Sequence, residues 1–259
     1  MMTKARLIDV SKCTACRGCQ VACKQWNELP AEHTTQRGTY ENPPELSGST
    51  WIKVEFRERP GEWLFRAHTC MHCTDASCEQ VCPSGAITHQ NGAVIINQEV
   101  CIGCGYCVQA CPFSVPHKDE ITGTARKCRL CIDRIGNGYE PACAKTCPTN
   151  AIQFGERDEL LAMANGRIQT LKNDYGYTNT NLYGEYELGG LNTLYILTDS
   201  PSTFGLPEAP QLAVSTAAAK WLSGIITAGV VAAIPFWLLF RRKKQIEAER
   251  QSKVEGGTR

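Results

Sequence analysis

The sequence predicts an α+β protein with one membrane-spanning helix near its C-terminal end. Three observations lead to this fold class. Sixteen cysteines fall into four groups of four, short segments typical of strands flank those groups, and a long uncharged segment follows them. With 259 residues, of which 42% are hydrophobic and 20% charged, the chain is suited to one or two folded domains.

The spacing of the cysteines indicates the kind of site they form. The first and third groups read C-x2-C-x2-C-x3-C, the spacing with which bacterial ferredoxins hold 4Fe-4S clusters. The second and fourth groups widen the middle gap to four and eleven residues, and proline follows the last cysteine of three groups. The groups are Cys13, Cys16, Cys19 and Cys23; Cys70, Cys73, Cys78 and Cys82; Cys101, Cys104, Cys107 and Cys111; and Cys128, Cys131, Cys143 and Cys147.

Disulfide bonds and zinc sites account for fewer of these features. Disulfide scaffolds are mostly shorter and spread their cysteines along the chain, whereas these cysteines are crowded at steps of three and four. Zinc ribbons pair two C-x2-C knuckles, which leaves the further cysteines and the prolines without a role. The pattern favours four 4Fe-4S clusters, and a membrane-anchored zinc scaffold is the distant alternative.

The fourth cysteine of each motif decides how the motifs pair, because in two-cluster ferredoxins it binds the other cluster. The second and third motifs are close in sequence and form an inner module, 70–111. The first and fourth motifs then form an outer module, from 1–69 and 112–200. The predicted ligand sets are site 1 (Cys13, Cys16, Cys19, Cys147), site 2 (Cys70, Cys73, Cys78, Cys111), site 3 (Cys101, Cys104, Cys107, Cys82) and site 4 (Cys128, Cys131, Cys143, Cys23).

The segments around the motifs predict the regular structure. Asn91-Gly92 is a strong turn signal between two apolar segments, so a hairpin is expected to link the second and third motifs. The insert between the first and second motifs begins as a polar loop and then alternates as a half-buried strand does. Strands are expected at 6–10, 51–58, 63–66, 86–89, 93–96, 151–154 and 194–197, and an amphipathic helix at 156–172.

The uncharged segment 221–240 predicts a transmembrane helix. Its twenty residues span about 30 Å as a helix, the thickness of a bilayer core. Residues 241–259 hold seven cations, whereas Lys220 is the one cation among the twenty residues before the segment. The positive-inside rule then predicts a cytoplasmic tail and a cluster domain on the outer, periplasmic face of the cytoplasmic membrane. The expected organisation is a four-cluster domain at 1–210, a linker at 211–220, the helix at 221–240 and a basic tail at 241–259.

Other functions find little support in the residues. The 20 Lys/Arg of residues 1–220 are scattered among 23 Asp/Glu, so no nucleic-acid partner is expected. No nucleophile–base pair, phosphate loop or carboxylate pair stands out, so we expect no catalytic site in this chain. His72 is not needed as a ligand because four cysteines complete each set. Lys127 and Arg129, beside Cys128, either tune a cluster or are solvated surface charges.

Five segments carry a resemblance to a known family: Cys23-Lys24-Gln25-Trp26-Asn27-Glu28-Leu29, Cys70-Met71-His72-Cys73, Cys101-Ile102-Gly103-Cys104-Gly105-Tyr106-Cys107, Lys127-Cys128-Arg129-Leu130-Cys131-Ile132-Asp133-Arg134 and Gly205-Leu206-Pro207-Glu208. With them, with both widened gaps and with its single C-terminal helix, the chain resembles the iron-sulfur (beta) subunit of membrane-bound respiratory formate dehydrogenases over essentially its full length. The four-cluster framework is shared with other molybdopterin-enzyme subunits, so these segments make the resemblance more specific.

The resemblance implies an electron-transfer subunit of a hetero-oligomer. It would take electrons from an alpha subunit that holds a molybdenum or tungsten bis-pterin site. It would pass them through four 4Fe-4S clusters to a cytochrome b-type gamma subunit that reduces quinone, and the C-terminal helix would dock on that subunit within the membrane lipid. The nearer alternative is the electron-transfer subunit of a membrane hydrogenase or of a sulfur-compound reductase.

Overall fold

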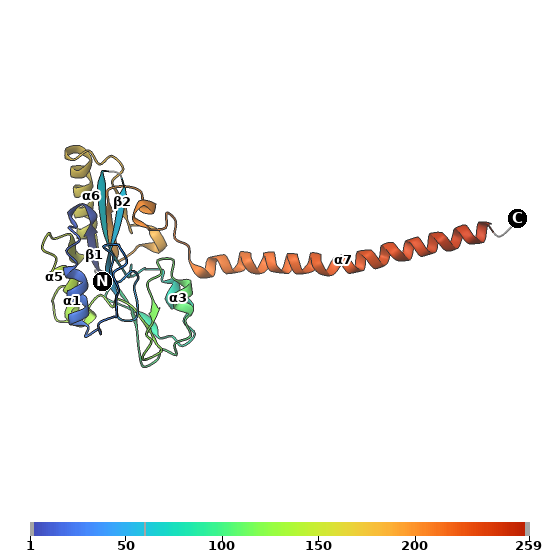
Figure 1. The fold of residues 1–259 in the computed structure, drawn as a ribbon, viewed down its shortest axis with the longest axis horizontal. Coiled ribbons are helices and arrows are strands. Elements are labelled where there is room, and N and C mark those ends of the chain that lie inside the picture. Colours follow the sequence, from blue (N-terminus) through green and yellow to red (C-terminus); the bar gives the residue numbers. More distant parts are fainter. Residues whose placement is uncertain (1–2, 60, 257–259) are drawn as a thin grey trace. The chain divides into compact units, whose positions relative to one another are not determined.

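The computed structural model describes residues 3–59 and 61–256 and divides the chain into two compact units (Figure 1). The first unit, Met1–Ala213, combines strands and helices, as the sequence predicts for an α+β fold. The described residues of the second unit, 214–256, lie within one long helix.

A four-stranded sheet joins the two ends of the first unit. Its central strand β1 is antiparallel to β8 and parallel to β10, and β9 is antiparallel to β10. The predicted strands before the first motif, after the fourth motif and near residue 195 are confirmed to within two residues. The fourth was not predicted because three residues are too few to show alternation. The strands are β1 (Lys4–Asp9), β8 (Ile152–Glu156), β9 (Asn181–Tyr183) and β10 (Thr193–Leu197).

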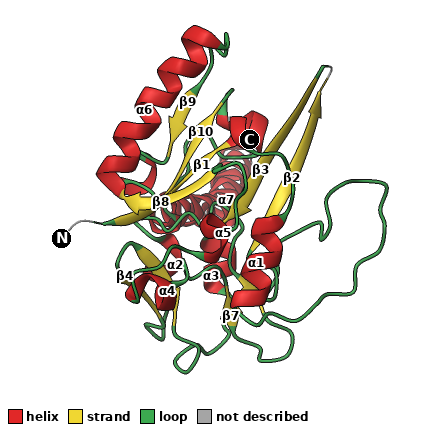
Figure 2. Ribbon diagram, turned by 90° about the vertical axis from the view of Figure 1, so that its left-hand side faces the viewer, coloured by secondary structure: helices red, strands yellow, loops and turns green. Residues whose placement is uncertain are grey.

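Helix α6 (Arg157–Asp174) covers one face of this sheet, which confirms the predicted helix (Figure 2). Because successive strand residues point to opposite faces, Arg6 and Ile8 lie on the other face, toward the cysteine motifs. Full burial of each large apolar side chain stabilises the fold by about 1.5–3 kcal/mol. The apolar contact joins Leu160, Ala164, Ile168 and Leu171 of the helix with Ala5, Leu7, Leu194 and Ile196 of the sheet.

Three hairpins complete the strands. The turn between β4 and β5 has positive φ at Asn91 (47°) and Gly92 (81°), as a two-residue hairpin of this kind requires. That hairpin was predicted and is confirmed, and the predicted strands at 51–58 and 63–66 are found as β2 and β3, which pair with each other. The pair β6–β7 was not predicted because each strand has two residues. The strands are β2 (Ile52–Arg59), β3 (Glu62–Thr69), β4 (Ile87–Gln90), β5 (Ala93–Ile96), β6 (His117–Lys118) and β7 (Ala125–Arg126).

Short helices begin within or beside the cysteine motifs. The helix of the first motif, α1, packs on α5 of the fourth motif, and α2 of the second packs on α3 of the third. Motifs that are far apart in the sequence therefore lie side by side. The helices are α1 (Gly18–Trp26), α2 (Ser77–Gln80), α3 (Tyr106–Ala110), α4 (Ile132–Gly136) and α5 (Ala142–Lys145), with 3-10 turns η1 (Val10–Lys12), η2 (Glu187–Gly189) and η3 (Pro201–Phe204).

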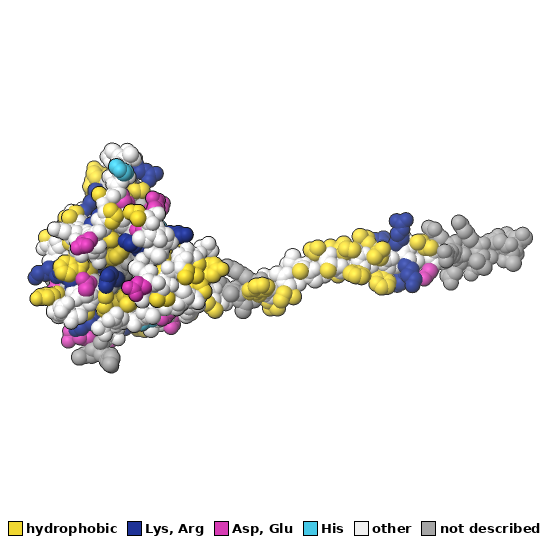
Figure 3. All heavy atoms as spheres, turned by 90° about the horizontal axis from the view of Figure 1, so that it is seen from below, with side chains coloured by type: hydrophobic (Ala, Val, Ile, Leu, Met, Phe, Trp, Pro, Cys, Tyr) yellow, Lys and Arg dark blue, Asp and Glu magenta, His cyan; other side chains and the backbone are white. Residues whose placement is uncertain are grey.

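The second unit consists of helix α7 (Ala213–Gly256), which contains the predicted transmembrane segment. Within it, Trp221–Glu247 has a mean hydropathy of 2.0 and is long and apolar enough to cross a membrane. Its apolar side chains are exposed, and the basic residues that begin at Arg241 follow them (Figure 3). Residues 257–259 of the predicted basic tail lie outside the described residues.

Candidate metal centres

All four motifs share one feature of backbone geometry. The second residue between the first two cysteines of each motif has a positive φ: Ala15 (54°), His72 (48°), Gly103 (67°) and Leu130 (54°). Three of these are not glycine, and each such residue costs of order 1–2 kcal/mol in this region. Left-handed residues of this kind turn consecutive backbone N–H groups toward one anion, as in many iron–sulfur sites. The amide of Leu130 accordingly donates to the Cys128 Sγ at 3.4 Å.

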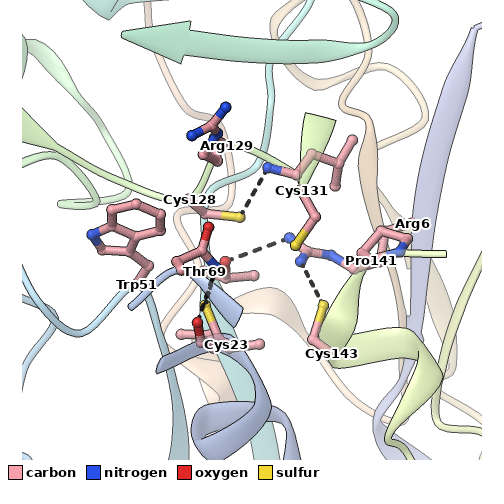
Figure 4. A pocket seen from close by; sticks show the side chains of 12 residues that line it. Arg6, Cys23, Trp51, Thr69, Cys128, Arg129, Cys131, Pro141 and Cys143 are labelled. Atoms are coloured by element: carbon pink, nitrogen blue, oxygen red, sulfur yellow. Dashed lines mark hydrogen bonds between the residues drawn. The ribbon is translucent and has the colours of Figure 1, made fainter. Parts of the chain in front are cut away.

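Three cavities are each lined by four cysteines from two motifs. They are lined by the cysteines of site 1, site 3 and site 4, respectively. Figure 4 shows the last of these, with the side chains of Cys23, Cys128, Cys131 and Cys143 around the hollow. In each cavity three cysteines come from one motif and the fourth is the last cysteine of the paired motif. Within residues 3–59 and 61–256, no three His, Cys, Asp or Glu side chains are placed to hold one metal ion.

The cysteines of site 2 also lie together. Burial raises the pKa of the Cys73 thiol, and the neighbouring thiols of Cys70, Cys111 and Cys78 raise it further. Burial likewise raises the pKa of Cys78 to about 12, with Cys70 and Cys111 acting in the same direction. The structure thus brings the cysteines of sites 1, 3 and 4 together around cavities and those of site 2 close to one another, and their role as ligand sets stays a prediction.

The four sites differ in their access to solvent. Cys16 in site 1 and Cys104 in site 3 are exposed, whereas all four cysteines of site 4 are buried. An exposed apolar side chain, Ile102 (68% exposed), lines site 3. Sites 1 and 3 therefore reach the surface, and site 4 lies inside the unit.

Arg6 is a buried arginine whose place beside a cysteine was not predicted. Its side chain is 1% exposed, and its Nη1 donates to the Cys143 Sγ at 3.3 Å (Figure 4). Its Nη2 donates to the Cys70 carbonyl at 3.2 Å and to the Thr193 hydroxyl at 3.0 Å. One guanidinium thus touches the second and the fourth motifs. Burial alone would raise the pKa of the Cys128 thiol, but the charge of Arg6 and the Leu130 amide lower it.

Lys127 is buried too, so the interpretation of this residue as a solvated surface charge is wrong. It is 4% exposed and donates through Nζ to the carbonyls of Val94 and Cys128, the latter at 3.2 Å. Burial alone would lower the pKa of Lys127, but the thiolates of Cys70, Cys78 and Cys128 raise it. Lys127 is therefore not a surface charge. Arg129, which is exposed, is a surface charge as the second interpretation expects.

His72 lies buried beside these groups. Its Nδ1 accepts the Val94 N–H at 3.0 Å, so Nε2 carries the hydrogen of the neutral ring. Burial, followed by the charges of Lys127 and Arg6, holds the pKa of His72 well below its usual range. Its Nε2 and the Arg6 Nε are buried nitrogens that have no hydrogen-bond partner among the described residues.

The residues present fit 4Fe-4S clusters. Four sulfurs around one hollow, backbone amides directed at sulfur, and buried cationic or N–H groups without a carboxylate are what an anionic cluster held by thiolates requires. A cluster held by four thiolates has lost the protons of all four. The raised thiol pKa values therefore apply to the cysteines before a cluster binds.

Comparison with protein families gives two matches. The model of a 4Fe-4S dicluster domain matches residues 61–157, which hold the second, third and fourth motifs. A second 4Fe-4S dicluster model matches residues 12–86, which hold the first and second motifs. The matches agree with an α+β protein that binds several 4Fe-4S clusters.

Comparison with characterised proteins gives relatives over most of the sequence. The protein is 42% identical to the iron-sulfur subunit of the nitrate-inducible formate dehydrogenase of Escherichia coli, over 88% of its own length and 81% of that subunit. It is 43% identical to the iron-sulfur subunit of formate dehydrogenase-O of the same organism, over 80% and 72%. It is also 39% identical to one subunit of the anaerobic dimethyl sulfoxide reductase of E. coli, over 59% and 73%.

Proposed function

Because this chain belongs to the iron-sulfur subunits of formate dehydrogenases, we propose that it holds four 4Fe-4S clusters and relays electrons through them. The observation that carries this proposal is the grouping of the cysteines. Three cavities are each lined by four cysteines drawn from two motifs, and the fourth set of cysteines lies together as well. Sites 1 to 4, as defined above, are the proposed ligand sets.

The proposed ligand sets nest one ferredoxin-like module inside another. Sites 2 and 3 belong to an inner module, 70–111, and sites 1 and 4 to an outer module formed by 1–69 and 112–200. The packing of α2 on α3 and of α1 on α5 supports this division. In this arrangement the bound clusters supply one-electron redox centres, and the protein supplies their thiolates, their spacing and their electrostatic surroundings.

The order of the sites along the relay follows from their neighbours. Helix α1, which holds Cys19 of site 1, packs on α5, which holds Cys143 of site 4, so sites 1 and 4 are adjacent. Helix α2, which holds Cys78 of site 2, packs on α3, which holds Cys107 of site 3, so sites 2 and 3 are adjacent. Lys127 lies near both site 2 and site 4. We therefore propose the order 1–4–2–3, with electrons entering and leaving at the exposed sites 1 and 3.

The proposed partners are those of a formate-oxidising complex. A catalytic subunit with a molybdenum or tungsten pterin would reduce the nearer exposed site, and a cytochrome b-type membrane subunit would take electrons from the other and reduce quinone. Helix α7 would cross the cytoplasmic membrane beside that subunit. The basic residues after its apolar stretch favour a tail in the cytoplasm and a cluster unit on the periplasmic face.

A second candidate function has one observation in its favour. The similarity to a subunit of a dimethyl sulfoxide reductase indicates that a related framework serves a sulfur-compound reductase elsewhere. In that case electrons would flow from quinone toward the catalytic subunit. The longer match at higher identity to the formate dehydrogenase subunits favours formate as the donor.

The test is to purify the native complex anaerobically in detergent and to measure iron, zinc and cluster reduction together. About sixteen irons in this subunit, with clusters that are reduced when formate is added, are the expected result. If iron is present but formate does not reduce the clusters, the relay function stands and formate is not its electron donor. Oxidation of the reduced clusters by dimethyl sulfoxide would then identify the second candidate. Zinc in place of iron would overturn the proposal.

A further inference from the structure

Among the described residues of the first unit, four lysine and arginine side chains are buried, and two of them differ from the other two in their partners. Arg66 and Lys53 are paired with carboxylates: Arg66 with Glu55 at 2.6 Å, and Lys53 with Glu41 at 2.7 Å. Arg6 and Lys127 form no ion pair with any Asp or Glu in the part of the chain that the structure describes. A buried charge without a counter-charge is unfavourable. Arg6 and Lys127 therefore need an anion that is not a carboxylate.

The contacts of Arg6 show where that anion lies. Its guanidinium donates to the Cys143 sulfur of site 4 and to the backbone carbonyl of Cys70, a residue of site 2. Thr193 on β10 fixes this position, because its hydroxyl accepts from Arg6 and donates to the same Cys70 carbonyl at 2.8 Å. Arg6 thus lies between sites 2 and 4 in one fixed geometry.

Lys127 lies at the same junction. Its ammonium donates to the carbonyl of Cys128, a residue of site 4, and to the carbonyl of Val94. Val94 also donates its N–H to His72, which lies between Cys70 and Cys73 of site 2. Lys127 therefore contacts the backbone of the fourth motif directly and reaches the second motif through Val94 and the His72 side chain.

We propose that Arg6 and Lys127 are positioning residues that stabilise the reduced forms of sites 2 and 4 and so raise the reduction potentials of this central pair above those they would otherwise have. This inference rests on the proposed function. Each transfer moves one electron, oxidising the site that gives it and reducing the site that takes it, with no bond or proton change. A fixed positive charge favours the state with the extra electron, and in a buried site the effect is weakly screened. Arginine does not lose its proton in proteins, so its charge is constant.

The junction has a particular role because it is where the relay crosses from one proposed module to the other. Without a counter-charge, an electron on site 2 would repel one on site 4 across the short gap that a single guanidinium bridges. The two cations reduce that repulsion. Sites 1 and 3, which are open to water through Cys16 and Cys104, are screened by solvent instead.

The experiment is a redox titration of the purified complex followed by electron paramagnetic resonance, which resolves the clusters separately. Arg6→Gln and Lys127→Gln each remove one charge. Each is expected to lower two of the four midpoint potentials by about 59 mV or more, a tenfold change in the one-electron equilibrium. Arg6→Lys keeps the charge and is expected to restore most of the shift. Arg59→Gln is the control, because Arg59 is an exposed arginine paired with Glu62 and Asp199 far along the β2–β3 hairpin.

The outcomes separate this inference from the proposed function. Fewer than four clusters in the wild-type complex would contradict the proposed function. Unchanged cluster potentials in both glutamine variants would overturn the inference. So would an equal shift of the potentials at all four sites, or a shift caused by Arg59→Gln. If Arg6→Gln assembles no clusters, Lys127→Gln tests the same two sites from the opposite side of the junction.

Discussion

Glu55 is a buried carboxylate in β2 that is surrounded by cationic side chains, and its replacement by glutamine is expected to destabilise the first unit. Arg66 donates to it from Nη2 at 2.6 Å and from Nε at 3.2 Å, and the His68 Nδ1 lies at 3.1 Å. Arg57 and Lys53 lie at 3.5 and 3.9 Å. Glu55→Gln keeps the shape of the side chain and removes the negative charge, which leaves Arg66 buried without its partner.

The expected magnitude follows from the burial of the pair. Glu55 is 9% exposed and Arg66 2%, and breaking a buried ion pair costs about 3–5 kcal/mol. For a unit of this size each kcal/mol lowers the unfolding midpoint by about 2–4 °C, so the midpoint should fall by about 6–20 °C. The assay is calorimetry of the complex at a fixed scan rate, together with the loss of visible cluster absorbance, because such proteins unfold irreversibly.

Glu62→Gln is the matched control. Glu62 lies on the same hairpin, is 42% exposed and pairs with Arg59, so its loss should change stability by less than about 1 kcal/mol. An unfolding midpoint for Glu55→Gln within about 2 °C of the wild type would refute the reasoning. Such a result would mean that the burial cost of the pair equals its attraction.

The same pair gives a pH dependence with a definite sign. Burial alone would raise the pKa of Glu55, but the hydrogen bond from His68 and the charge of Arg66 outweigh it and hold the pKa well below its usual range. A carboxyl with a lowered folded pKa contributes stability above its unfolded pKa, about 4.3, and loses it as the pH falls toward the folded value. The difference in stability between wild type and Glu55→Gln should therefore shrink from pH 6 to pH 3.

Three further predictions concern the sites, the fold and the helix. Cys131→Ala removes one sulfur from site 4 and should lower the iron content by about four atoms per chain, measured by iron analysis. Gly92→Ala puts a Cβ against the Lys4 carbonyl at φ 81° and should speed hydrogen exchange in β4 and β5. The control Gly61→Ala, at φ 82° with open space around it, should speed hydrogen exchange in β2 and β3 by less. Val231→Arg should cost about 2.5–3.5 kcal/mol of membrane insertion, and equal insertion of variant and wild type in an insertion assay would contradict a transmembrane role for α7.

Much of the fold was predictable from the sequence because it depends on local signals. The Asn91-Gly92 turn favours a hairpin in any context, and the alternation before Glu58 predicts one half-buried strand. The cysteine sets followed from a spacing rule, and the structure groups the same residues in space. Their role as cluster ligands stays a prediction, as do the nested modules.

Arg6 shows what local signals do not contain. In the sequence it begins the predicted strand 6–10 and follows Lys4 by two residues, and an arginine at such a place is usually exposed. The structure buries it because β1 is the second strand of the sheet, covered by α6 on one face and by two cysteine motifs on the other. Its neighbours come from residues 70, 143 and 193, and only the tertiary fold brings these together. A charge within an apolar strand just before a cysteine motif was the available signal.

The central position of β1 constrains the order in which the protein can mature. β1 forms early in synthesis, but its partners β8 and β10 leave the ribosome about 150 to 190 residues later, which is many seconds at 5–20 residues per second. Through that interval the N-terminal strand has two open edges and the outer pair of sites lacks half of its sulfurs, whereas the inner pair has all of its ligands by residue 111. Nascent chains are thus expected to need protection of the β1 edges, and iron delivery to the inner pair can precede delivery to the outer pair.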